Sequence, residues 1–253
     1  MHINRRYRYA VPLAITATLM PIQAAVGGII SSESCLPPQQ GDPAYVGSLH
    51  ARYDATALWF KDPSHHRFLA CTTPPTPDKP GPQPHGFMST IDVWMSIDNG
   101  VTYSFVSAPA DVEVLVTWFG DNSGAGFSPS TPGYIQSFAL EMVKLDMMLP
   151  SLMLREDPDD NADGVPAESL GEATIELLDD GNYKIDSFFD IFTEISLDDG
   201  QTWHNSVDAD GNAYASRVVL VPTPAPLLLM LGGLAWQLRG VRSSRALRIR
   251  LRP

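Results

Sequence analysis

Hydrophobic and polar residues alternate with a period of two in the central part of the chain. The apolar members of three such segments are Ile91, Val93, Met95 and Ile97, then Val112, Val114, Val116 and Trp118, then Phe189, Ile191, Ile195 and Leu197. Successive side chains of a strand point to opposite faces of a sheet, so this pattern predicts half-buried antiparallel strands. Clusters of Gly, Asn, Asp and Pro separate the segments, as turns require. Only 135–145 has a helix-like pattern, and a strand is the alternative there. We therefore expect an all-β, antiparallel β-sandwich-like body.

The body contains an internal repeat. Residues 96–103 read Ser-Ile-Asp-Asn-Gly-Val-Thr-Tyr, and residues 196–203 read Ser-Leu-Asp-Asp-Gly-Gln-Thr-Trp. A Gly after Asn or Asp, between two alternating runs, predicts a hairpin because Gly accepts a positive φ. The shared pattern resembles the Asp-box of sialidases and related β-propeller proteins, where it is a structural hairpin. Two copies are too few for the roughly four or more blades of a propeller, so we interpret them as turns of the fold.

The first 25 residues have the pattern of a secretory signal peptide. Arg5, Arg6 and Arg8 precede an apolar run over 10–20, and small residues follow at Ala24 and Ala25. The apolar run is too short to span a bilayer, and its flanks are typical of export. We predict that 1–25 is a signal peptide and that 26–217 is the exported body.

The other end, 218–253, has an apolar stretch followed by a basic tail. The stretch 218–238 has no charged residue, and Pro226 suits the first turn of a helix over 225–238. Six arginines follow, at Arg239, Arg242, Arg245, Arg248, Arg250 and Arg252. The pattern predicts a single short membrane helix whose basic tail stays in the cytoplasm, with the body outside.

A Val-Pro-x-Pro tetrapeptide, an apolar segment and an arginine cluster together resemble the PEP-CTERM sorting signal of Gram-negative bacteria. The matching residues are Val221, Pro222, Thr223 and Pro224, then 227–238, then the cluster that begins with Arg239, Arg242 and Arg245. Thr223 stands where that signal usually has Glu. The resemblance implies that the secretion machinery exports the chain, that an exosortase in the inner membrane processes it, and that the body reaches the cell surface or the medium. A simple C-terminal anchor is the alternative. The stretches 107–112, 153–156 and 188–194 are also similar to a group of exported PEP-CTERM proteins of environmental bacteria, and this resemblance spans about residues 45–221. It implies export and a β-rich body and no particular activity.

The charge distribution excludes one class of partner. The chain of 253 residues has a net charge of −12, and all 29 acidic residues lie between positions 26 and 217. Nine of the 17 basic residues lie in the two terminal segments. Nucleic-acid binding needs clustered Lys and Arg to contact phosphates, so an acidic body predicts no nucleic-acid partner.

Cys35 and Cys71 are the only two cysteines of the chain. An even count in an exported protein predicts one disulfide, and two buried free thiols are the alternative. The segment 72–86 follows, and its six prolines predict an extended exposed loop.

Candidate metal ligands occur in one acidic segment. Asp159, Asn161 and Asp163 precede Gly164 and imitate the first half of a calcium-binding loop, although Leu170 replaces its final Glu. Calcium is thus the one cofactor that the sequence suggests, and the alternative to a calcium site is a solvated acidic loop. The adjacent His65 and His66 would face opposite sides of a strand, so they are poor joint ligands.

No nucleophile, metalloprotease, Walker or dinucleotide motif occurs in the chain, so we predict no catalytic residues. The leading hypothesis is a non-enzymatic protein of the cell envelope or extracellular matrix, with an exopolysaccharide as a candidate partner. The second hypothesis is a secreted glycan-binding module, with Trp94 or Trp203 stacking on sugars and calcium assisting. A hydrolase with a pair of carboxylates is the third, although no particular pair stands out.

Overall fold

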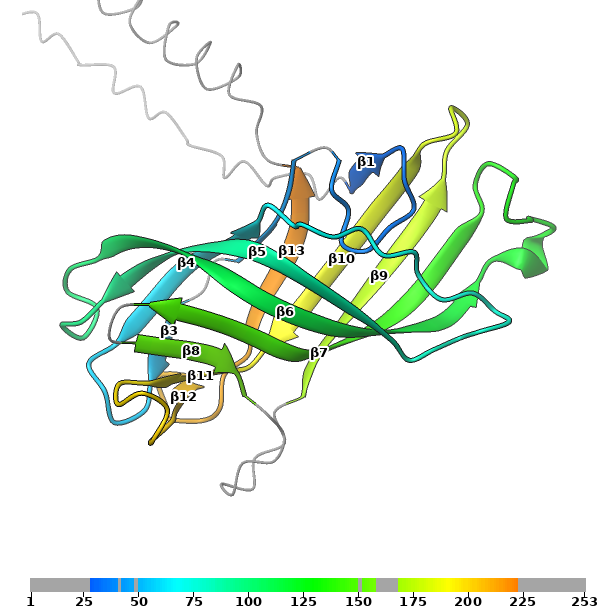
Figure 1. The fold of residues 1–253 in the computed structure, drawn as a ribbon. Helices are drawn as coiled ribbons and strands as arrows, with labels where there is room; N and C mark the ends of the chain where they lie inside the picture. Colours follow the sequence, from blue (N-terminus) through cyan, green and yellow to red (C-terminus); the bar gives the residue numbers. More distant parts are fainter. Residues whose placement is uncertain (1–27, 41, 48–49, 150–151, 158–167, 223–253) are drawn as a thin grey trace, which may run out of the picture.

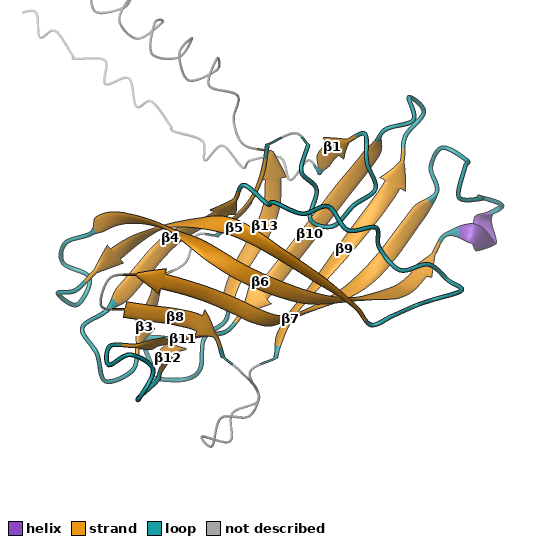
Figure 2. Ribbon diagram, in the orientation of Figure 1, coloured by secondary structure: helices purple, strands orange, loops and turns teal. Residues whose placement is uncertain are grey.

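The computed structural model describes residues 28–40, 42–47, 50–149, 152–157 and 168–222. Its strands are β1 (Ile29–Ser31), β2 (Pro43–Val46), β3 (His50–Tyr53), β4 (Trp59–His66), β5 (Gln83–Ser96), β6 (Ser104–Asp121), β7 (Ile135–Leu149), β8 (Leu152–Glu156), β9 (Ser169–Leu177), β10 (Tyr183–Ile191), β11 (Thr193–Ser196), β12 (His204–Val207) and β13 (Ser216–Pro222). The only helical element among these residues is the single 3-10 turn Ser123–Ala125, at one end of the molecule (Figure 2). The predicted all-β fold is confirmed.

Two layers of antiparallel strands enclose one core. The long strands β5, β6 and β7 cross in front of β9, β10 and β13 (Figure 1). β7 pairs with β9 over its first half and with β8 at its end, and β4 pairs with both β2 and β3. Since β4 also pairs with β5, the hydrogen-bonded network closes on itself and forms a β-sandwich-like body.

The alternating pattern placed the core correctly in the strand interiors. Val112, Val114 and Val116 are buried, and the same holds for Phe189 and Ile195. The segment 135–145 is a strand, part of β7. Ile97 and Leu197 were predicted to face the core with their neighbours, but both are exposed because the chain turns there.

The two Asp-boxes form matching turns, between β5 and β6 and between β11 and β12. Asp98 accepts hydrogen bonds from the backbone N–H and the hydroxyl of Thr102, at 2.8 and 2.6 Å, and Asp198 accepts the same bonds from Thr202 at 2.8 and 2.7 Å. The bonds from Thr102, followed by one from the Ser96 hydroxyl, lower the pKa of Asp98 to about 2. Both carboxylates are thus held by their own turns, in agreement with a structural role.

The strand order repeats around the Asp-boxes. Eight strands pair in the order β4-β5-β6-β7-β8-β11-β12-β3, and β3 pairs again with β4, so they form a ring. In this ring β11 lies four places after β5, and β12 lies four places after β6. The second Asp-box hairpin therefore lies four places after the first. In the same way, β8 lies four places after β4 in the ring. A cation on each of these strands lies over the Asp-box aromatic ring: Lys61 is 4.1 Å from the Tyr103 centroid, and Arg155 is 3.8 Å from that of Trp203. The sequence repeat therefore coincides with a repeat of strand pairing.

Replacing Gly200 with Val is expected to destabilise the body by about 1–3 kcal/mol, because a β-branched residue resists the φ of +84° found there. For a domain of this size each kcal/mol lowers the melting temperature by about 2–4 °C, which calorimetry would detect. Gly120→Val is the matched control, since a β-carbon at Gly120 meets no atom within 4 Å. Equal melting temperatures for Gly200→Val and the wild type would contradict the assignment of a strained turn.

Two predicted boundaries need correction. Strand β13 continues to Pro222, with Val221 opposite Ala44 and Pro222 opposite Pro43, so the body does not end at 217. The start of the predicted sorting motif is thus part of the sheet. The end of the proline-rich loop 72–86 is also wrong, because β5 begins at Gln83 and buries His85 against the core.

The structure contains the predicted disulfide between Cys35 and Cys71, whose Cα atoms are 5.3 Å apart. The predicted signal peptide 1–25, the membrane helix 225–238 and the arginines Arg239, Arg242 and Arg245 lie outside the described residues. Within the described ranges, no helix has the length and apolar character needed to cross a membrane.

Candidate functional site

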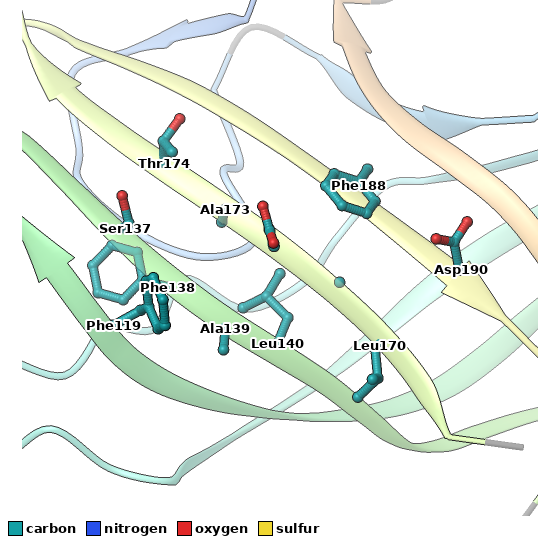
Figure 3. A pocket seen from close by; sticks show the side chains of 12 residues that line it. Phe119, Ser137, Phe138, Ala139, Leu140, Leu170, Ala173, Thr174, Phe188 and Asp190 are labelled. Atoms are coloured by element: carbon teal, nitrogen blue, oxygen red, sulfur yellow. The ribbon is translucent and has the colours of Figure 1, made fainter. Parts of the chain in front are cut away.

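An open groove of about 480 Å³ lies on the outer face of strands β6, β7, β9 and β10 (Figure 3). Its lining consists of Phe119, Ser137, Phe138, Ala139, Leu140, Leu170, Gly171, Glu172, Ala173, Thr174, Phe188 and Asp190. The side chains at 137, 139, 172 and 174 alternate with buried core positions, which places them on the outside of the sheet. Phe119 lies at one end of the groove, and Phe188 and Asp190 lie at the other.

Small residues and an irregular strand make this face hollow. Ser137, Ala139 and Thr174 leave space where larger side chains would fill it. The register between β6 and β7 shifts between Trp118 and Gly120, and Phe119 at this bulge is 79% exposed. A β-bulge changes the direction in which a side chain points, and this accounts for the exposure of Phe119. Gly171 is required for close packing, because a β-carbon there would collide with the carbonyl oxygen of Phe188.

Where β9 and β10 form the end of the groove, a carboxylate lies beside an aromatic ring. Glu172 on β9 is directly opposite Phe188 on β10. The guanidinium of Arg217 covers Phe188 at 4.1 Å from the ring centroid, and its Nε lies 3.8 Å from a carboxylate oxygen of Asp190. Aromatic rings offer apolar faces to the C–H groups of a ligand, and carboxylates and hydroxyls offer hydrogen bonds. This combination suits a ligand rich in both C–H and hydroxyl groups.

The two predicted sugar-stacking residues lie outside the groove. Trp94 is on the outward face of β5, 41% exposed, with its ring 5.5 Å from that of Phe105. Trp203 is covered by Arg155, which also forms an ion pair with the buried Glu194. Trp203 therefore closes the second hairpin over the sheet, and one of its faces is not available to a ligand.

The predicted calcium ligands Asp159, Asn161 and Asp163 lie outside the described residues, as do Thr223 and Pro224 of the predicted sorting motif. The weaker acidic segment at 208–212 is described. There Asp208 accepts hydrogen bonds of 2.9 Å from the backbone N–H of both Asp210 and Asn212, so its carboxylate stabilises a turn.

The adjacent histidines face opposite sides of β4, as predicted. His65 is buried, bonds Ser89 inside the core, and has its pKa lowered to about 3 by burial and, to a smaller extent, by the charge of His66. His66 instead contacts Asp92 at 3.0 Å. The two imidazoles therefore do not form a joint site, and the buried Ser89 is not accessible as a nucleophile.

Buried acidic residues gather where β8 ends. Glu156, Asp157 and Glu194 are each less than a tenth exposed. The pKa of Glu156 is raised to about 8: burial is the largest cause, a hydrogen bond from Ser169 partly opposes it, and the charges of nearby carboxylates add to it. None of these acids lines the groove.

The sequence alone did not point to Phe119, Glu172 or Phe188 as site residues. No local motif marks them, since the groove combines the consecutive strands β6 and β7 with the consecutive strands β9 and β10, and the two pairs are distant along the chain. One signal was present: Phe188 occupies a position opposite the core in a predicted strand, next to the buried Phe189.

Comparisons with known proteins found no match: no family model, no curated protein and no solved structure is similar to the chain.

Proposed function

We propose that the protein is an exported, non-enzymatic component of the cell envelope or extracellular matrix that binds polysaccharide through the groove. The observation that carries this proposal is the groove itself, where the exposed Phe119 and Glu172 and the half-buried Phe188 surround a floor of small residues. Sugar rings have apolar faces and hydroxyl edges, and such a surface can contact both.

The disulfide supports the export part of the proposal, because disulfides persist in oxidising compartments outside the cytoplasm. Sorting by an exosortase, passage through the inner membrane and release at the surface rest on the sequence resemblance at Val221–Pro224 and the arginine cluster. A contribution of calcium, through Asp159, Asn161 and Asp163, also rests on the sequence. Repeating the binding measurement with a chelator would test it.

Binding is favoured over hydrolysis by the position of the acidic groups. A glycosidase needs one carboxylic acid that stays protonated near neutral pH, beside a second carboxylate. Among the described carboxylates, the one whose pKa burial raises to about 8 is Glu156, which does not line the groove. This arrangement supports a binding surface.

Phe188→Ala is expected to weaken polysaccharide binding about tenfold, because one aromatic contact contributes about 0.5–1.5 kcal/mol and 1.4 kcal/mol corresponds to a factor of ten. Ala139→Trp should weaken binding further by filling the floor. Affinity electrophoresis in gels that contain soluble polysaccharides measures both effects.

Phe105→Ala is the matched control, since Phe105 is 55% exposed but lies on strand β6 outside the groove lining. It should leave binding unchanged. If Phe188→Ala and Ala139→Trp bind as well as the wild type while all variants stay folded, the groove is not the binding surface.

A further inference from the structure

A second hollow, of about 310 Å³, adjoins the groove on the side of β13. It is lined by Glu172, Ala173, Thr174, Asp186, Ser187, Phe188, Arg217, Val219 and Leu220, and four of these residues also line the first groove. The two hollows are therefore continuous, and we name them together the trough. Glu172 and Phe188 lie at its middle, where the hollows meet.

The trough runs across the strands. Its lining begins at Phe119 on β6, continues over β7, β9 and β10, and ends at Val219 on β13. With neighbouring strands about 4.8 Å apart, four such steps correspond to roughly 19 Å. A single sugar ring is much shorter, so the shape suits several consecutive sugars of a linear chain.

Some of the carboxylates of the trough have a basic partner and one does not. Asp186 forms an ion pair of 2.9 Å with Lys184, and Asp190 lies near Arg217. Among the described residues, Glu172 has neither an ion pair nor a hydrogen-bonding partner for its side chain. Its carboxylate can accept hydrogen bonds from sugar hydroxyls, and it repels a carboxylate or sulfate on the ligand.

We propose that the trough holds an internal stretch of a linear, uncharged polysaccharide, with consecutive sugars on both sides of Phe188. This inference rests on the proposed function and specifies the length and the charge of the polysaccharide that is bound. The tests below separate the two, because binding of a short or an anionic ligand would preserve the proposed function and overturn only the inference.

Chain length is tested by calorimetry with oligosaccharides of increasing length cut from whichever neutral polysaccharide binds best. Affinity is expected to rise at least tenfold between the disaccharide and chains that span both hollows, and then to stay constant. A disaccharide that binds as tightly as the polymer would overturn the inference.

Val219→Trp tests the second hollow separately. Val219 lies at the far end of the trough, outside the first groove. The variant is expected to reduce the affinity for long chains to that for short ones, without changing the affinity for short ones. An unchanged affinity for long chains, in a variant with a wild-type melting temperature, would overturn the inference.

Charge is tested with the neutral polymer, with alginate as the anionic probe, and with the variant Glu172→Gln. Wild-type protein should bind alginate at least tenfold more weakly than the neutral polymer in low salt, and the gap should narrow as salt screens the repulsion. Glu172→Gln should also reduce the difference in affinity between the neutral polymer and alginate. The control Glu176→Gln should leave this difference unchanged, because Glu176 is on the same strand but lines neither hollow. Tighter binding of alginate by the wild type would overturn the inference.

Discussion

Ending the chain after Arg217 is expected to abolish folding, whereas ending it after Pro222 should preserve the body. The difference is strand β13, which pairs with β10 on one side and β2 on the other. Val218 and Leu220 are 5% and 1% exposed, and burying each contributes about 1.5–3 kcal/mol. Their loss, together with two unpaired strand edges, is comparable to the roughly 5–15 kcal/mol that stabilises a typical domain.

Circular dichroism and melting curves of chains ending at Arg217, Leu220 and Pro222 would measure this effect. The chain ending at Leu220 should be intermediate, because it loses only the pairs of Val221 with Ala44 and Pro222 with Pro43. A folded, cooperative chain ending at Arg217 would show that β13 is dispensable and contradict the structure.

Replacing Glu156 with Gln is expected to stabilise the body at pH 8 and to have little effect at pH 4. The raised pKa, about 8, lies above the value of about 4.3 in an unfolded chain, so the folded state binds this proton more tightly. The stability that comes from protonated Glu156 is therefore fully present below about pH 4.3, and it is lost as the pH rises from about 4.3 to 8. Gln resembles the protonated acid and does not lose its proton.

The expected gain at pH 8 is about 2–3 kcal/mol, less than the full shift at about 1.4 kcal/mol per pKa unit because solvent screens part of the charge. Denaturant unfolding at several pH values would measure it. Glu113→Gln, on β6, is the control and should follow the wild type at every pH. A constant difference between Glu156→Gln and the wild type from pH 4 to pH 8 would rule out this titration.

The local parts of the fold could be predicted from the sequence. Alternation identified the strands that contain Val114 and Phe189, and the Asp-box pattern located both hairpins, because these features depend on residues close together along the chain. The break between β10 and β11, after Ile191, could not be predicted in this way. Both strands have an alternating pattern, and only their different partners, β9 and β8, separate them.

The end of β13 and the groove were missed for a related reason. Val221 and Pro222 resemble a sorting motif in the sequence, and their role in the sheet depends on β2, far away along the chain. The groove depends on a register shift at Phe119 and on the close approach of Gly171 to β10. Such features are consequences of strand pairing, and the sequence contains no local signal for them.

The closed strand network also has a consequence for self-association. Every described strand except β1 is hydrogen-bonded to a neighbour on both sides over at least part of its length, and β1 has only three residues. Free strand edges are the places where proteins recruit further copies and grow into fibrils. Because most of its strand edges are paired, this protein has little unpaired backbone through which copies could polymerise, even at high concentration.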